Sequence, residues 1–141
     1  MQIKPINEGN NKFCGPAVLS AIAGITTDEA EKLINSVRNV KEDRKVTGVY
    51  NHELNASFEK LGYKVYHLPS THGRSIYFLM MNISSPGIYL FYVHGHVVAI
   101  EIETSGKRYL IDNNTKSPLN LSSSARLGQK VIGVVKLEKV L

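Results

Sequence analysis

The spacing of the apolar residues changes near residue 62, and this change constrains the fold more than any other feature of the sequence. Before it, apolar residues follow helical patterns, and after it they alternate or form short runs that are typical of strands. The helical patterns cover residues 16–23, 26–37 and 51–61. The strand patterns cover residues 63–68, 88–93, 96–103, 108–113 and 130–138, with a short helix over 75–82 between the first two. Helices followed by an antiparallel sheet predict an α+β fold.

Several residues indicate where the helices begin and end. The run from Pro16 to Ala23 is apolar on nearly all sides, which predicts a buried helix, and a proline fits its first turn. Gly24 follows this run and is expected to end it. Thr26 and Glu29 have the spacing of a capping box, which predicts that a second helix starts there.

Length and composition indicate a globular protein without disulfides. The 141 residues suffice for one domain with a hydrophobic core, and 43% of them are hydrophobic. A single cysteine excludes an internal disulfide. The N-terminal residues show no signal-peptide pattern, and no apolar stretch approaches the roughly 20 residues of a membrane helix. We therefore expect a cytoplasmic protein that does not act in a membrane.

The net charge of +5 is not concentrated in a nucleic-acid site. The longest charged run, residues 41–45, is interrupted by Glu42 and Asp43. A nucleic-acid site would combine a basic patch with interleaved aromatic residues, and the sequence contains no such pattern. We therefore expect no nucleic-acid partner.

The only cysteine, Cys14, precedes a Gly-Pro pair at the start of the expected buried helix. The positive end of a helix dipole lowers the pKa of a thiol, and so does a neighbouring imidazolium. His96 opens an apolar strand and Asp112 closes the next one, so both lie at one end of a predicted hairpin. We therefore expect Cys14 to be a nucleophile with His96 as its base, and Gly15 to leave room for a substrate backbone.

The residue that orients His96 depends on the turn between the two strands. A three-residue loop over 104–106 places Asp112 diagonal to His96 on the same side of the hairpin. A two-residue turn shifts the register by one and places Asn113 there instead. Either side chain would accept the imidazole N–H and set its tautomer, and the turn sequence leaves both alternatives open.

Three segments resemble papain-like cysteine peptidases, especially small bacterial and phage members. They are "CGPAVLSAIAGI", "GHVVAI" and "LIDNN", in this order. The resemblance implies that residues 1–141 form a single papain-like domain. In that fold the cysteine starts a central helix, and the N-terminal helices pack on a C-terminal antiparallel sheet. By position, the resemblance also implies Cys14 as the nucleophile, His96 as the general base and Asp112 as the orienting residue, with Asn113 as the second choice.

The sequence departs from this family just before the cysteine. Many members carry a glutamine there that donates to the oxyanion hole, whereas this chain has Glu8, and an ionised carboxylate cannot donate. Asn11 is the nearest substitute, and the backbone N–H of Cys14 is the other expected donor. Losing one such donor costs on the order of a hundredfold in rate.

Together these residues predict a cysteine-dependent hydrolase or acyl transferase. It would act on a peptide, isopeptide or amide bond through a thioester intermediate. We expect a protein or peptide as its substrate, and neither a cofactor nor a metal ion. Because the chain is short, the segments 40–50 and 69–75 are expected to determine specificity.

Two other functions fit parts of the sequence. A non-catalytic papain-fold binding or inhibitor protein of phage or mobile-element origin would also be small, basic and without a clear oxyanion residue. A metal-dependent hydrolase would use His94 and His96, with Cys14 or Asp112 as a further zinc ligand. Gly95 between the two histidines indicates a bend and argues against the zinc site.

Overall fold

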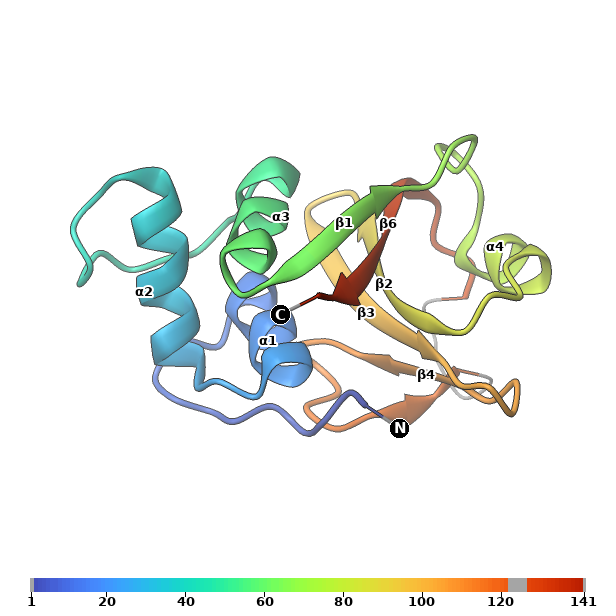
Figure 1. Ribbon diagram of the computed structural model, residues 1–141, viewed down its shortest axis with the longest axis horizontal. Coiled ribbons are helices and arrows are strands. Elements are labelled where there is room, and N and C mark those ends of the chain that lie inside the picture. The colour runs from blue at the N-terminus through green and yellow to red at the C-terminus, as the bar shows by residue number, and fades with distance from the viewer. Residues whose placement is uncertain (1, 122–126, 141) are drawn as a thin grey trace.

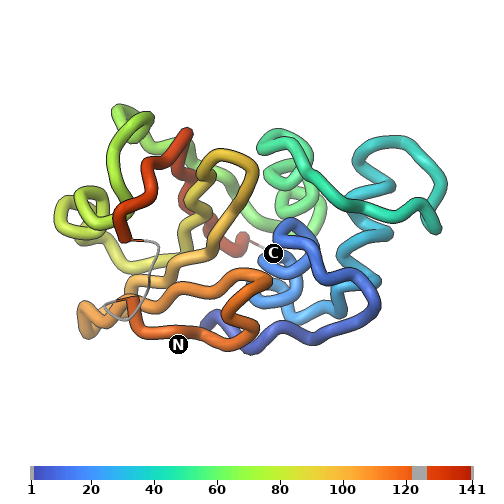
Figure 2. The backbone as a smooth tube through the Cα atoms, turned by 180° about the vertical axis from the view of Figure 1, so that it is seen from behind, coloured from blue at the N-terminus to red at the C-terminus, as the bar shows by residue number. Residues whose placement is uncertain are grey.

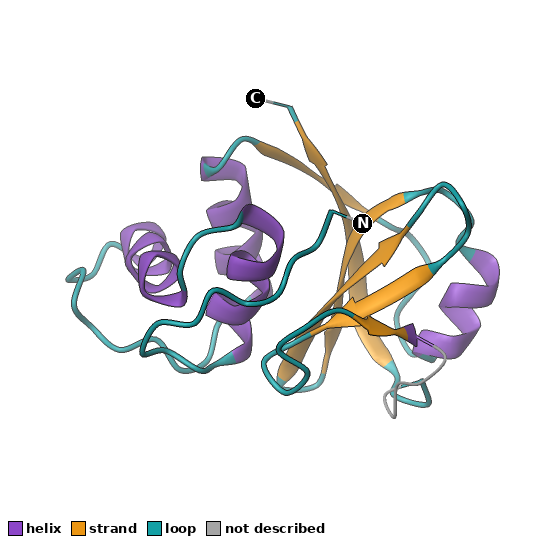
Figure 3. Ribbon diagram, turned by 90° about the horizontal axis from the view of Figure 1, so that it is seen from below, coloured by secondary structure: helices purple, strands orange, loops and turns teal. Residues whose placement is uncertain are grey.

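The computed structural model describes residues 2–121 and 127–140. The helices in these ranges are α1 (Cys14–Ala23), α2 (Thr27–Arg38), α3 (Asn51–Lys60) and α4 (Ile76–Asn82). The strands are β1 (Tyr63–His67), β2 (Gly87–Val93), β3 (His96–Ile102), β4 (Arg108–Ile111), β5 (Leu119–Asn120) and β6 (Val131–Lys139). The helices α1, α2 and α3 gather on one side of the sheet and α4 on the other (Figures 1 and 3). The predicted α+β fold is therefore confirmed.

One antiparallel sheet connects all six strands in the order β1-β6-β2-β3-β4-β5. The last strand, β6, lies between β1 and β2 and pairs with both. The five predicted strands are confirmed to within about two residues at each end, as expected for boundaries derived from patterns. The two-residue strand β5 is missed, because so short a segment cannot show an alternating pattern.

The sheet is buried on both faces. In β2, Ile88 and Leu90 pack in a core with residues of α1, α2 and α3, whereas Tyr89 and Phe91 pack in a second core with residues of α4. Successive residues of a strand point to opposite faces, so a strand covered on both sides appears in the sequence as one continuous apolar run. Among the described residues, no helix is both long enough and apolar enough to span a bilayer.

The helix-end predictions are confirmed in detail. Thr26 Oγ1 accepts the Glu29 N–H at 3.0 Å, and Glu29 Oε1 accepts the Thr26 N–H at 3.1 Å. Gly24 follows α1 with a φ of 79°, a left-handed conformation that favours glycine. Helix α1 begins two residues earlier than predicted, at Cys14, so that Pro16 lies in its first turn.

The segment before α1 runs beside the loop that follows β4 (Figure 2). The Ile6 N–H donates to the carbonyl oxygen of Lys116 at 2.9 Å. This contact joins two segments that are far apart in the sequence, the one that leads to Cys14 and the one that follows Asp112. It therefore brings together the parts of the chain that carry the candidate site.

Candidate active site

Helix α1 places Cys14 at an N-terminus without a side-chain cap. Phe13, at the N-cap position, makes no capping hydrogen bond through its side chain, and the first turn of this fully described helix contains no acidic residue. The backbone N–H of Gly15 donates to the Cys14 sulfur. Because the positive end of the helix dipole lies here, this position stabilises a thiolate.

The Cys14 sulfur also contacts the start of β3. It is hydrogen-bonded with the ring of His96 and with the backbone N–H of Val97. Burial is the largest single influence and by itself raises the pKa of the thiol, but the hydrogen bonds and the charge of His96 together outweigh it. The pKa of Cys14 therefore lies below its ordinary value, which favours the thiolate.

His96 connects Cys14 to a buried carboxylate. His96 Nε2 lies 2.9 Å from Oδ2 of Asp112, whose side chain is completely buried. Because Nε2 meets the carboxylate, Nδ1 is the ring nitrogen that remains for the sulfur. The negative charge of Asp112 stabilises an imidazolium at His96, and the contact sets the orientation of the ring.

The Asp112 carboxylate is held in place from its other side. Its Oδ1 accepts the N–H groups of Asn114 at 2.9 Å and of Thr115 at 3.0 Å. The Asp112 N–H in turn donates to Thr115 Oγ1 at 3.0 Å. This turn around the aspartate explains why β4 ends at Ile111, two residues earlier than predicted. A buried charge with several hydrogen bonds is compatible with a stable fold.

The register of the β3–β4 hairpin decides between Asp112 and Asn113 as the neighbour of His96. Ala99 pairs with Ile111, which corresponds to the three-residue loop over 104–106. In this register Asp112 and His96 lie on one side of the hairpin. The Asn113 amide instead donates to the carbonyl oxygen of Lys12 at 3.2 Å.

Cys14 and His96 line a hollow of about 770 Å³. Its other walls are Phe13, the loop 47–51 before and at the start of α3, parts of the β2–β3 hairpin, Asn113 and Ile132. Of the two segments expected to determine specificity, 40–50 therefore contributes directly to this hollow. A second hollow of about 470 Å³ is lined by much of the other segment, 69–75.

No protein-family profile matches the chain, and no curated protein matches it. Several solved structures resemble it, and two of them do so over nearly their whole length. One is the peptidase domain of Streptococcus ComA, a bifunctional ABC transporter involved in a quorum-sensing pathway. Its TM-score is 0.57 at 13% identity, with 96% of this chain and 97% of that chain covered.

The other is a double-glycine-motif protease from an AMS/PCAT transporter in complex with a leader peptide. Its TM-score is 0.60 at 11% identity, with 99% of this chain and 94% of that chain covered. The chain has a papain-like fold. The helices packed on an antiparallel sheet, with the cysteine at the start of α1, agree with the architecture expected from the sequence.

In this papain-like fold, the side chain of Asn11 forms its hydrogen bonds within the protein. Its side chain is buried, and its Nδ2 donates to Glu31 Oε2 at 2.6 Å and to the carbonyl oxygen of Val46 at 2.8 Å. Its Oδ1 accepts the Phe13 N–H at 2.9 Å. Both amide hydrogens are therefore committed to the protein, so the side chain has none to offer an oxyanion. These contacts join three segments of the protein, and they argue against the predicted oxyanion role of Asn11.

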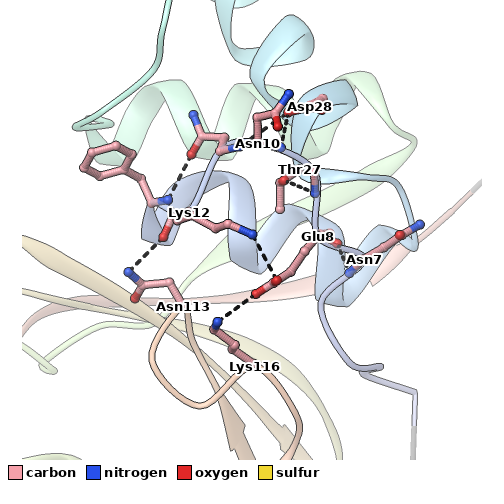
Figure 4. A network of polar contacts seen from close by, with 12 residues as sticks. Asn7, Glu8, Asn10, Lys12, Thr27, Asp28, Asn113 and Lys116 are labelled. Carbon is pink, nitrogen blue, oxygen red and sulfur yellow. Dashed lines mark hydrogen bonds and ion pairs between the residues drawn. The ribbon is translucent and has the colours of Figure 1, made fainter.

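Glu8 does not supply an oxyanion donor either. Its carboxylate lies 3.0 Å from Lys12 Nζ and 3.2 Å from Lys116 Nζ. Figure 4 shows the two lysines on either side of Glu8. The hydrogen bonds of these two lysines hold the pKa of Glu8 below its ordinary value, so this side chain stays an acceptor. Glu8 thus bridges the segment before Cys14 and the loop after Asp112. Of the donors expected from the sequence, the backbone N–H of Cys14 remains.

Gly15 also has a different role from the one predicted. It is buried, and a Cβ atom placed on it would lie 2.5 Å from Cγ2 of Val49. The space that a side chain would fill is therefore occupied by the loop before α3 and not open to a substrate. Gly15 lets this loop approach α1 closely and form a wall of the hollow.

Three polar side chains of α2 hold the loop between α2 and α3, and the sequence did not reveal this role. Glu31 Oε2 accepts the Val46 N–H at 2.9 Å, and Arg38 donates to the carbonyl oxygen of Gly48. Asn35 lies between them on the helix, and its Nδ2 donates to carbonyl oxygens of the same loop. The spacing of four and three residues places all three on one helix face. This spacing is visible in the sequence and indicates that the three side chains can act on the same segment.

The two histidines considered for a zinc site point to different surroundings: His96 contacts Cys14 and Asp112, whereas His94 lies in a turn. His94 and Gly95 form the exposed turn between β2 and β3, where Gly95 has a φ of 67°. Among the residues described in the two ranges, no three His, Cys, Asp or Glu side chains are placed to hold one metal ion.

Proposed function

We propose that the protein is a cysteine-dependent hydrolase or acyl transferase that acts on a peptide, isopeptide or amide bond. One observation carries this proposal: the Cys14 sulfur, the His96 ring and the buried Asp112 carboxylate form a continuous hydrogen-bonded chain at a helix N-terminus. This chain contains a nucleophile with a lowered pKa, a base next to it and a group that orients the base.

In the proposed reaction, the Cys14 thiolate attacks the carbonyl carbon of the substrate. The negative charge that develops on the carbonyl oxygen is stabilised by the backbone N–H of Cys14. The protonated His96 then gives its Nδ1 proton to the leaving nitrogen, the C–N bond breaks, and a thioester remains on Cys14.

The second half of the reaction releases the acyl group. His96, now neutral, removes a proton from water or from an acceptor amine, which attacks the thioester carbon. The C–S bond breaks, the thiolate is restored, and His96 keeps the proton that it needs for the next cycle. Throughout, Asp112 keeps the imidazole in place and stabilises its charged form.

A peptide is the substrate class that we propose. The hollow next to Cys14 and His96 is large enough for side chains on either side of a scissile bond. The two similar structures are a peptidase domain and a protease in complex with a leader peptide, which supports the same class of substrate for this chain.

A specific observation also favours the second candidate, a non-catalytic binding protein with this fold. Glu8 is paired with two lysines, and the amide hydrogens of Asn11 are used within the protein. Neither side chain therefore donates a second hydrogen bond to an oxyanion in addition to the one from the Cys14 N–H. A protein that only binds its partner would not need such a donor.

Alkylation with iodoacetamide at pH 6 tests the nucleophile, because Cys14 is the only cysteine and a single mass shift reports on it. We expect the wild type to react and His96→Ala to react far more slowly. His94→Ala is a matched control, because it removes an exposed histidine two residues away and should react like the wild type. An unreactive wild type would refute the catalytic proposal.

Cleavage of a complex peptide mixture separates the two candidates. New peptide termini are identified by mass spectrometry after incubation with the wild type or with Cys14→Ser. Termini that appear only with the wild type support the enzyme, whereas a reactive thiol without any cleavage favours the binding protein. The substitution should change the free energy of unfolding by about 1 kcal/mol or less, because the site is only partly buried.

A further inference from the structure

The hollow at Cys14 adjoins the second hollow. Asn51, Tyr92 and Ile132 line both of them, so the two hollows are adjacent, and together they are called the groove. The second hollow is bounded by the end of β1, the loop 70–74 and residues 132–135 of β6. A groove of this kind suits an extended peptide segment.

A hydrogen bond between two uncharged side chains lies in the middle of the groove. Tyr92 Oη donates to Asn55 Oδ1 at 2.6 Å. Burial raises the pKa of Tyr92, so its hydroxyl stays protonated and remains a donor. This part of the groove therefore carries no charge and gives a substrate no ionic contact.

The two ends of the groove differ in their charge. Near Cys14, the lining includes the apolar side chains of Phe13, Val49 and Ile132. At the far end, all ionisable side chains in the lining are basic: His67, His72 and Arg74. A ligand that fills the whole groove would therefore meet an apolar surface beside the reacting sulfur and a positive charge farther away.

Arg74 is the residue with a permanent positive charge that lines the far end of the groove. Its guanidinium lies over the ring of Phe78, 4.7 Å from the ring centre, and its side chain forms no ion pair with a carboxylate among residues 2–121 and 127–140. His72 lies beside it, and its Nδ1 donates to the carbonyl oxygen of Ile132 at 3.1 Å. This leaves Nε2 as the ring nitrogen of His72 that can meet a ligand.

We propose that the groove selects a peptide segment with an apolar side chain at the bond next to Cys14 and an Asp or Glu side chain that binds Arg74. A guanidinium pairs with a carboxylate through two parallel hydrogen bonds, and His72 adds a third donor when it is protonated. The inference rests on the proposed function, because it assigns a substrate class to the same site.

Reversible peptide binding tests this inference without any chemistry at the cysteine. The protein is Cys14→Ala, and the probes are fluorescent Ala/Leu/Gly peptides that carry one Glu, or the isosteric Gln, at each position in turn. Affinity is measured by fluorescence anisotropy. We expect Glu to bind about two- to fivefold more tightly than Gln at one or two positions, the range of an ion pair that is partly exposed to solvent.

Two charge-removing variants locate the contact. In the same background, Arg74→Gln should abolish the preference for Glu and leave the affinity of the Gln peptides unchanged. Lys130→Gln is the matched control, because Lys130 is exposed, pairs through its backbone with Ser75, and does not line the groove. It should keep the preference.

Equal affinity of both peptide series, no binding of either, or a preference that survives Arg74→Gln would each overturn the inference. These results are independent of the alkylation of wild-type Cys14 at pH 6, which tests the proposed function. An unreactive thiol together with a preference for Glu that Arg74→Gln abolishes would mean that the groove binds acidic peptides but that the catalytic proposal fails.

Discussion

His96 Nε2 and Asp112 Oδ2 lie 2.9 Å apart, and the other carboxylate oxygen of Asp112 is bound by two backbone N–H groups. The carboxylate is therefore unable to turn away from the imidazole without losing these bonds. Its negative charge acts on Cys14 through His96, since an imidazolium next to the sulfur favours the thiolate.

Replacing Asp112 with asparagine should lower the reactivity of Cys14. The N–H groups of Asn114 and Thr115 would keep the amide oxygen, so the amide NH₂ would face His96 Nε2 and require it to be an acceptor. This disfavours the imidazolium, and we expect alkylation by iodoacetamide at pH 6 to slow by about tenfold or more. Asn113→Ala is the control and should leave the rate unchanged. If Asn113→Ala slowed alkylation and Asp112→Asn did not, Asp112 would not be the residue that orients His96.

The alkylation rate should remain high below the ordinary pKa range of thiols. Because the pKa of Cys14 is lowered, the thiolate persists as the pH falls, and the half-maximal rate should lie at a lower pH than for a free thiol, whose pKa is about 8.5. His96→Ala should move the midpoint upward, because it removes a hydrogen bond and a positive charge. Alkylation rates measured by mass spectrometry from pH 4 to pH 10 give both midpoints.

The same lowered pKa links the stability of the fold to pH. Ionisation of Cys14 stabilises the folded state at pH values above the ordinary thiol pKa, and this contribution is lost as the pH falls through the folded-state pKa. The pH dependence of the free energy of unfolding should therefore be weaker in Cys14→Ser over this range. Identical pH dependence in the two proteins would argue against a thiolate in the folded state.

Asn11→Ala should destabilise the fold. The substitution removes three hydrogen bonds and leaves Glu31 Oε2 with the Val46 N–H as its remaining donor, which should cost about 1–3 kcal/mol in the free energy of unfolding. Urea denaturation measures this loss. An oxyanion role predicts the reverse, unchanged stability with slower peptide cleavage, and that result would restore the role predicted from the sequence.

Gly15→Ala should disturb the loop that forms a wall of the hollow. The new methyl group would lie 2.5 Å from Val49 Cγ2, and relieving this overlap should cost about 1–3 kcal/mol. Gly48→Ala in the same loop is the control, because an added methyl group there meets no atom within 4 Å. Thermal unfolding of both variants checks the difference. Equal stability of the two variants would mean that the loop moves away from the new methyl group without a loss in the free energy of unfolding.

The local structure of this chain follows from short stretches of sequence. The Thr26–Glu29 capping box, the glycine after α1 and the apolar runs of the strands each depend on residues within a few positions of one another. Such features act over one turn or one strand, so they are visible without the fold. The positions of Cys14 at a helix start and of His96 at a strand start follow from the same local patterns.

The partners of the polar side chains were decided by the tertiary structure alone. Asn11 lies close to Cys14 in the sequence, yet its amide points toward Glu31 and Val46, which come from α2 and the loop after it. Likewise, the sequence left Asp112 and Asn113 as alternatives until the hairpin register placed Asp112 against His96. The physical reason is the same in both cases: a hydrogen bond is specific over about 3 Å, and which groups come that close depends on how distant segments pack.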